Sequence, residues 1–151
     1  MRSVQRLLIT AVAAGVATAA FAGVAGADST LSKKQYLKAA NGICKASNKE
    51  IDAAFEEVGG FGKNDEPSPE QVDEVVGRIV PIFRGVLDDI EALKGPAALD
   101  KKIDALVDKY RGVVDDVEAD PQALFQEHAP DPFAKLDQKA KQLGLKVCAQ
   151  G

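Results

Sequence analysis

The sequence predicts an all-α protein: an antiparallel four-helix bundle with a short extra helical turn, closed by one disulfide. Apolar residues recur every three or four positions in four separate stretches, which is the spacing of amphipathic helices. No stretch alternates apolar and polar residues as a half-buried strand does. Serine, glycine and proline stand at the ends of these stretches, where helices begin and end. Helices joined in this way are expected to pack as antiparallel neighbours.

The first helix is expected between Ser32 and Gly59. Ser32 and Gln35 form the S-x-x-Q capping box of a helix start, and Gly59-Gly60 ends the helix. The residues of its predicted inner face follow the helical spacing: Leu37, Ala40, Cys44, Ser47, Ile51, Phe55 and Val58.

The second helix repeats the same start, with Ser68 as the cap, Pro69 as the first helical residue and Gln71 closing the box. Gly95-Pro96 ends it. Pro81 lies inside this helix, where proline costs about 3 kcal/mol. Gly77 and Pro81 fall opposite the apolar stripe, so the freed carbonyl is expected to face water. The stripe itself is unbroken: Val72, Val76, Ile79, Phe83, Val86, Ile90 and Leu93.

The third helix is expected to end at Asp120-Pro121, with Asp120 capping a short helical turn that begins at Pro121. Acidic residues crowd its C-terminal end, where negative charge is unfavourable, and the sequence gives no reason for them: Asp115, Asp116 and Glu118. The predicted inner face consists of Leu99, Ile103, Leu106, Tyr110, Val113 and Val117.

The last helix is expected to start at Asp131-Pro132 and to finish at Gly144. Gly144 followed by Leu145 is typical of a Schellman ending, in which the residue after the glycine packs back on the last turn. One face of this helix is apolar, with Phe133, Leu136, Ala140 and Leu143 at helical spacing.

Residues 1–27 have the layout of a secretory signal peptide. Two arginines precede an uncharged run that starts at Leu7, and Ala25-Gly26-Ala27 is an A-x-A cleavage site. A membrane anchor is the alternative, because about 20 uncharged residues can span a bilayer, but this run consists mostly of small residues. We therefore expect an exported protein, secreted or associated with the cell envelope, in which residues 28–151 form a single helical domain with no stable membrane insertion.

The composition excludes several classes of partner. The net charge is −4 at pH 7, and the signal peptide carries two arginines and no acid, so the exported part is more acidic still. An acidic protein is poorly suited to nucleic acid or to an anionic membrane. Tryptophan is absent and aromatic residues make up 5 % of the chain, which argues against a platform that stacks sugars or bases.

The chain carries no residue set typical of a metal, cofactor or catalytic site. The first, third, fifth and twelfth positions of a calcium loop are matched by Asp116, Glu118, Asp120 and Glu127. However, Pro121 stands where that loop needs a glycine. His128 is the only histidine, and no serine or cysteine has an adjacent histidine base. The prediction is that the protein binds no metal or cofactor and is not an enzyme.

The segment "NGICKASN" is the most informative cluster. Cys44 falls at the centre of the predicted inner face, and Asn41 and Asn48 flank it. An asparagine on a core face needs partners, because an unsatisfied buried amide costs about 1–3 kcal/mol. One interpretation is a polar contact inside the bundle, with Tyr110 as a candidate partner. The other is a polar patch at the mouth of a ligand pocket.

The two cysteines allow one intramolecular bridge, between Cys44 and Cys148. Export to an oxidising space permits a disulfide. The predicted turn at Gly144 lets the end of the chain lie against the core. We therefore expect the bridge to join the end of the chain to the first helix.

Both ends of the chain also carry a resemblance. "YLKAANGICKASNKEI" has a cysteine followed four residues later by asparagine, and "AKQLGLKVC" closes with LGL-x-x-C. These segments resemble small exported actinobacterial α-helical proteins, and the matching residues are Cys44, Asn48, Leu143, Gly144, Leu145 and Cys148. The resemblance implies export and a disulfide, and it names no activity.

Two functions are expected from these features. The first is a non-catalytic helical module that binds a protein or cell-envelope partner. The second is a carrier that holds a small apolar ligand between the helices. A continuous core without a cavity favours the first function, whereas an apolar cavity of a few hundred Å³ favours the second.

Overall fold

The computed structural model describes residues 30–59, 67–126 and 130–150, and every structural statement below concerns these residues. The predicted signal peptide and the only histidine, His128, lie outside them.

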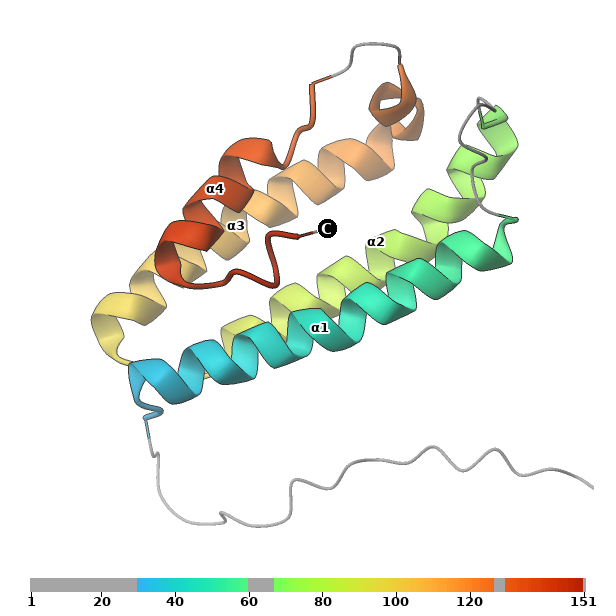
Figure 1. The fold of residues 1–151 in the computed structure, drawn as a ribbon. Coiled ribbons are helices and arrows are strands. Elements are labelled where there is room, and N and C mark those ends of the chain that lie inside the picture. Colours follow the sequence, from blue (N-terminus) through green and yellow to red (C-terminus); the bar gives the residue numbers. More distant parts are fainter. Residues whose placement is uncertain (1–29, 60–66, 127–129, 151) are drawn as a thin grey trace, which may run out of the picture.

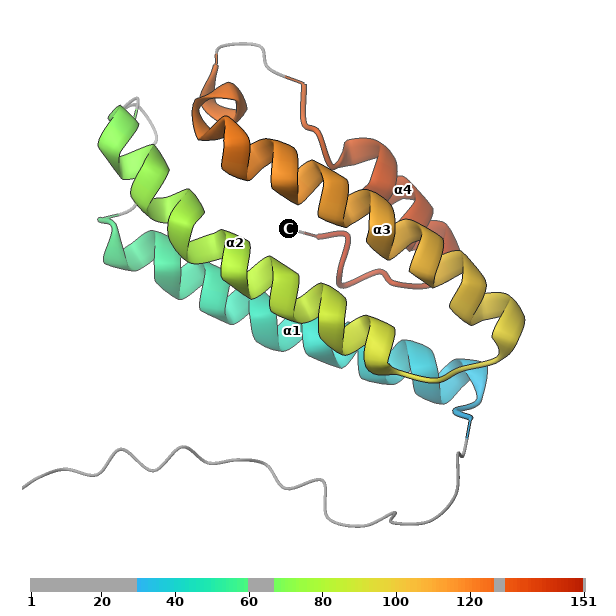
Figure 2. The ribbon, with the colours of Figure 1, turned by 180° about the vertical axis from the view of Figure 1, so that it is seen from behind.

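The described chain is all-helical and contains no strand, which confirms the predicted fold class. Three long helices each run antiparallel to the next, and a short fourth helix packs on the third (Figures 1 and 2). The rest of the chain then turns back between this fourth helix and the first (Figures 1 and 2). The elements, in order, are α1 (Lys33–Glu57), α2 (Pro69–Ala92), α3 (Ala97–Ala119), the 3₁₀ turn η1 (Pro121–Phe125) and α4 (Ala134–Leu143).

Both predicted capping boxes are formed. The hydroxyls of Ser32 and Ser68 accept the backbone N–H groups of Gln35 and Gln71, at 3.4 and 3.3 Å. Each glutamine side chain in turn accepts the backbone N–H of its serine. These contacts satisfy donors that a helix start otherwise leaves unpaired. They explain why α1 and α2 begin where the sequence indicates.

Pro81 lies inside α2 without ending it, and both Pro81 and Gly77 are exposed, as predicted. A carbonyl that loses its helical partner on this face is reached by water, which lowers the cost of the proline. The apolar face of α2 therefore continues unbroken across the proline.

The short turn begins at Pro121 as predicted, but its predicted cap and the predicted start of the last helix are wrong. Asp120 makes no side-chain cap on η1, and its φ of −140° and ψ of 76° differ from the extended conformation of the two capping serines. The last helix begins at Ala134 rather than at Asp131-Pro132. The Asp131 carboxylate instead accepts the backbone N–H of Phe133 at 2.8 Å, which holds a turn ahead of the helix.

The buried face of α3 is wider than the predicted stripe. Val107 and Val114, which the spacing left out, are buried, whereas Tyr110, Val113 and Val117 are only half-buried. The reason is tertiary, since α3 packs against α2 and also against α4.

The acidic C-terminal end of α3 has a partner on α2. Arg84 donates to Asp115 at 2.7 Å and to Glu118 at 2.6 Å. One guanidinium therefore offsets two of the carboxylates that the sequence left unexplained. These groups are exposed, so the pairs add little to the stability of the fold.

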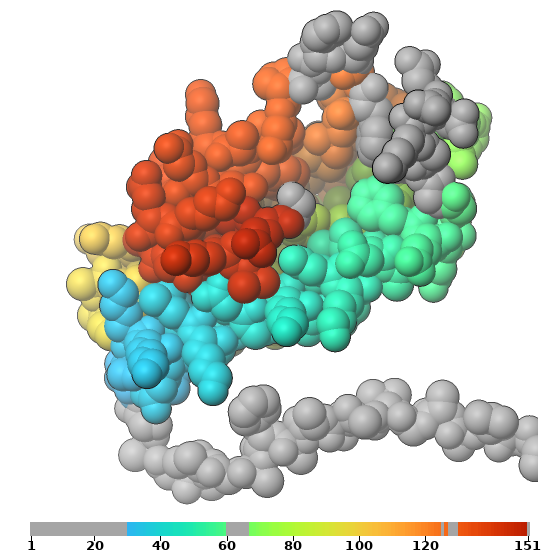
Figure 3. Space-filling view, in the orientation of Figure 1, coloured from blue at the N-terminus to red at the C-terminus, as the bar shows by residue number. Residues whose placement is uncertain are grey.

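Helix α4 ends in the predicted Schellman motif. Gly144 has a φ of +100°, and its N–H donates to Lys141 O at 3.1 Å. The N–H of Leu145 donates to Ala140 O at 2.9 Å, which completes the motif. Residues 144–150, which form turns rather than a helix, then run back along α1, and we call them the C-terminal tail (Figure 3).

The apolar interior falls into two parts. The larger part, which we call the closed core, is built from α1, α2 and α3 and is covered by α4 and the tail, with Leu145 and Ala149 buried in it. The smaller part lies at the other end of the bundle. Its buried residues are all valines, and we call it the valine cluster: Val72, Val75, Val76, Val80 and Val114.

Candidate functional site

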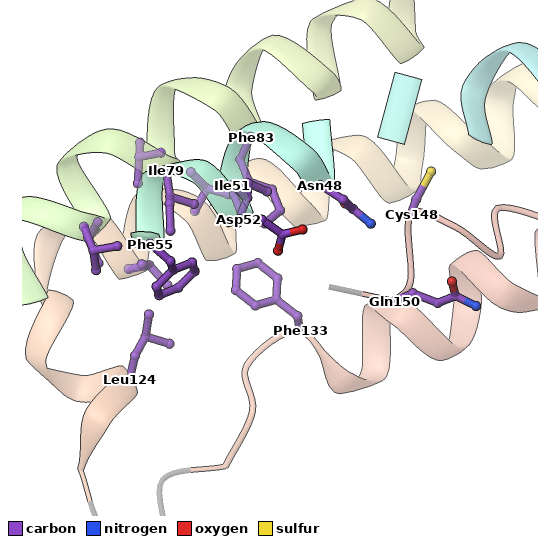
Figure 4. Close-up of a pocket in the computed structure, with 15 residues that line it drawn as sticks. Asn48, Ile51, Asp52, Phe55, Ile79, Phe83, Leu124, Phe133, Cys148 and Gln150 are labelled. Carbon is purple, nitrogen blue, oxygen red and sulfur yellow. The ribbon is translucent and has the colours of Figure 1, made fainter. Parts of the chain in front are cut away.

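The candidate site is a cavity of about 420 Å³ beside the valine cluster (Figure 4). It lies between α1, α2 and α3, with η1 and Phe133 on one side and the C-terminal tail on another. The described residues that line it are Asn48, Ile51, Asp52, Phe55, Val75, Val76, Ile79, Val80, Phe83, Val114, Val117, Leu124, Phe133, Cys148 and Gln150.

Unequal helix lengths explain why the cavity is there. At 1.5 Å per residue, α1 with its 25 residues is about 37 Å long, whereas α4 with its 10 residues is about 15 Å long. The fourth position of the bundle is therefore filled beside the closed core only. Beside the valine cluster, that position is bordered by η1, Phe133 and the end of the tail.

The walls of the cavity are apolar and partly aromatic. The rings of Phe83 on α2 and Phe133 before α4 stack with centroids 5.9 Å apart and planes 3° from parallel. Phe133 also stacks on Tyr110 at 6.2 Å. Phe133 is thereby fixed at the edge of the cavity, because it contacts rings from two other helices.

Polar groups reach the cavity at its rim. Asn48 and Asp52 lie one turn apart on α1, and Gln150 lies near them on the tail (Figure 4). Asn48 is half-buried, whereas Asp52 and Gln150 are exposed. An apolar body with a few polar groups on one side is the usual composition of a small-molecule site.

A second, inner cavity of about 50 Å³ continues into the closed core. It shares four lining residues with the larger cavity: Asn48, Ile51, Phe83 and Cys148. Tyr110 also lines it, and its hydroxyl donates to Asp137 on α4 at 2.7 Å. Burial, and then this bond to a carboxylate, raise the pKa of Tyr110. Its hydroxyl therefore stays protonated and acts as a donor.

The structure places the predicted residues in three different roles. The predicted disulfide is confirmed: Cys44 and Cys148 are bonded, with 5.0 Å between their Cα atoms. Asn41 bonds to the C-terminal tail, and Asn48 lies on the cavity. Neither asparagine bonds to Tyr110, because α4 brings Asp137 to that hydroxyl instead.

Sequence reasoning missed several residues of the site. Leu124 and Asp52 were not singled out, and Phe133 was expected only as part of the inner face of the last helix. The sequence does show a final helix much shorter than the other three. That difference in length is the signal from which an unfilled end could have been inferred.

The described part of the chain holds no group of three histidine, cysteine, aspartate or glutamate residues placed to bind a metal ion. Among the described helices, none is long and apolar enough to cross a membrane.

Comparisons with protein-family models, with curated proteins and with solved structures returned no match to this chain.

Proposed function

We propose that the protein is an exported carrier that holds a small apolar ligand between its helices. The observation that supports this proposal is the cavity of about 420 Å³ beside the valine cluster. Ligand sites in proteins typically have volumes of roughly 300–1,000 Å³ and mostly apolar walls. Of the two functions expected from the sequence, an apolar cavity of this size favours the carrier.

The character of the walls supports binding rather than catalysis. Among the described lining residues there is no histidine, serine, lysine or free cysteine, and Asp52 is the one ionisable side chain. Nucleophilic or acid–base catalysis needs at least one positioned pair of such groups. We therefore propose a non-catalytic role.

Two further features support export. The Cys44–Cys148 disulfide is of the kind that persists in oxidising compartments. The N-terminal segment has the pattern of a signal peptide. Binding of a protein or cell-envelope partner, the other function expected from the sequence, stays a prediction.

The proposal is tested by titrating the purified protein with N-phenylnaphthylamine, whose fluorescence rises in apolar surroundings. The test variant is Ile79→Trp, which places an indole where a half-buried side chain lines the cavity. The matched control is Ile82→Trp, on the same helix and also half-buried, which lines a more open hollow of about 490 Å³ elsewhere. We expect the wild type and Ile82→Trp to bind the probe, and Ile79→Trp to lose most of the binding.

Circular dichroism and thermal melts show whether each variant is folded. A wild-type protein that does not enhance the fluorescence of the probe contradicts the proposal. So does a folded Ile79→Trp variant that binds as tightly as Ile82→Trp. Native mass spectrometry of protein purified from its own secretion medium then gives the mass of any ligand that it carries.

A further inference from the structure

The polar residues at the rim of the cavity indicate which polar group a bound ligand would carry. Asn48 and Asp52 occupy successive turns of α1, so their side chains lie on one face of that helix. Gln150 also lines the cavity from the C-terminal tail, with its amide turned away from Asp52 (Figure 4). The rest of the described lining consists of apolar side chains and the disulfide-bonded Cys148. A ligand that fills the cavity therefore meets polar groups on one side only.

The Asn48 amide has no hydrogen-bond partner among the described residues, although its side chain is half-buried. Asn41, two turns earlier on the same helix, makes three hydrogen bonds. No side-chain nitrogen or oxygen that is fully buried in the described structure lacks a partner, so solvent reaches the Asn48 amide. An amide that is open to solvent and faces a cavity can accept from one ligand group and donate to another.

Asp52 sets the sign of charge at the rim. It is the one charged residue among the described residues that line the cavity, and no ion pair to it is found in the described structure. An anionic head group bound there would lie near a carboxylate at an apolar surface, where repulsion is less screened than in bulk water. Like charges placed together are a common means of rejecting a ligand.

The volume limits the apolar body. The volume of about 420 Å³ lies toward the lower end of the roughly 300–1,000 Å³ that small-molecule sites occupy. A ligand with one apolar chain suits a site at this end of the range.

We infer that the ligand is a single-chain amphiphile whose head group donates hydrogen bonds and carries no negative charge. Its chain lies in the cavity between α1, α2 and α3, and its head lies at the rim beside Asn48 and Asp52. This inference rests on the proposed carrier function and specifies the chemistry of the ligand. Asn48 and Asp52 are then the residues that determine specificity.

The test uses three amphiphiles of equal chain length and different head groups: dodecylammonium, dodecanol and dodecanoate. Each displaces N-phenylnaphthylamine from the purified protein at neutral pH and low salt, below the concentration at which micelles form. We expect dodecylammonium to compete most strongly, dodecanol next and dodecanoate least. The affinities for dodecylammonium and dodecanoate should differ roughly three- to tenfold, since an exposed charge changes affinity by a small factor.

Variants separate charge from hydrogen bonding. Asp52→Asn should bring the affinities for dodecylammonium and dodecanoate together. Glu50→Gln removes an equal charge from the same helix but at a more open hollow outside the cavity, and should leave the ratio of the two affinities unchanged. Asn48→Leu should weaken the binding of dodecanol and of dodecylammonium by the same factor. In the wild type, added salt should reduce the difference in affinity between dodecylammonium and dodecanoate.

The outcomes distinguish this inference from the proposed function. If the probe does not bind, or no amphiphile displaces it, the carrier function is contradicted. If all three compete equally, or dodecanoate competes best, the carrier function stands and the inference is overturned. The inference also fails if Asp52→Asn and Glu50→Gln change the ratio of the affinities for dodecylammonium and dodecanoate by the same factor.

Discussion

The side-chain oxygen of Asn41 accepts a hydrogen bond from the backbone N–H of Val147 at 2.8 Å. The same side chain donates to the Gly144 carbonyl at 3.0 Å and to the Leu37 carbonyl at 2.7 Å. One amide on α1 therefore satisfies two backbone groups of the C-terminal tail, in a segment without secondary-structure partners. The Asn41 side chain and the disulfide together hold the tail against α1. Cys148 and Gln150 of the tail then line one edge of the cavity.

Replacing Asn41 should destabilise the protein more than replacing Asn48. Asn41→Ala leaves the Gly144 carbonyl and the Val147 N–H without partners, so the free energy of unfolding should fall by about 1–3 kcal/mol. Asn48→Ala removes no hydrogen bond within the described structure and should cost less than about 0.5 kcal/mol. Urea unfolding followed by circular dichroism measures both. Equal losses in the two variants would show that Asn41 does not hold the tail.

Reducing the disulfide should lower stability substantially. Cys44 and Cys148 are 104 positions apart, and a loop of about 100 residues gives roughly 4.7 kcal/mol in the chain-entropy model. A domain of this size has only about 5–15 kcal/mol in total. Thermal melts with and without reductant test this, with a thiol assay to confirm complete reduction. An unchanged melting temperature in the fully reduced protein contradicts the prediction.

Replacing Gly95 by alanine should lower the stability of the protein, whereas replacing Gly85 by alanine should raise it. A Cβ on Gly95 would lie 2.6 Å from Cδ2 of Tyr36 and 2.9 Å from the Asp100 carboxylate, which also accepts the Gly95 N–H. Gly95→Ala should therefore cost about 1–3 kcal/mol. Gly85 is exposed inside α2 with nothing within 4 Å of a Cβ, so Gly85→Ala should stabilise by about 0.5–1 kcal/mol. Chemical denaturation of both variants decides whether the signs differ.

Stability should fall at alkaline pH because of Tyr36. Burial, and then Asp100 and Asp104, raise the pKa of its hydroxyl from 10.0 to about 12. The folded state therefore keeps a proton that the unfolded state loses first. Tyr36 therefore contributes roughly 3 kcal/mol to the free energy of unfolding below the unfolded pKa of about 10. This contribution is lost as the pH rises through the folded pKa of about 12.

Tyr36→Phe should flatten this pH dependence, because it removes the group that titrates. The comparison with the wild type isolates Tyr36 from the lysines, which titrate in the same range. Tyr36 and Tyr110 are the only tyrosines in the chain, and the pKa of Tyr110 is raised as well. An ultraviolet titration of the folded protein should therefore show no tyrosinate near pH 10. Tyrosinate formed at that pH without unfolding contradicts the prediction.

The sequence by itself determined the helices and most of their ends. The capping boxes at Ser32 and Ser68, the turn at Gly144 and the apolar spacing of α1 and α2 are local signals. They act over three to five residues, so they can be identified in the sequence without knowledge of the fold. The pairing of the two cysteines was also determined, because two cysteines allow only one intramolecular bridge.

Only the tertiary structure decided which side chains meet. Asn41 and Asn48 look equivalent on a helical wheel, yet the first bonds to the C-terminal tail and the second faces the cavity. The difference comes from where the tail crosses α1, and residues 41 and 147 are 106 positions apart. No periodicity within one helix encodes such a contact. The cavity has the same kind of origin, because it is the space that α4 and the tail, packed over the closed core, leave open beside the valine cluster.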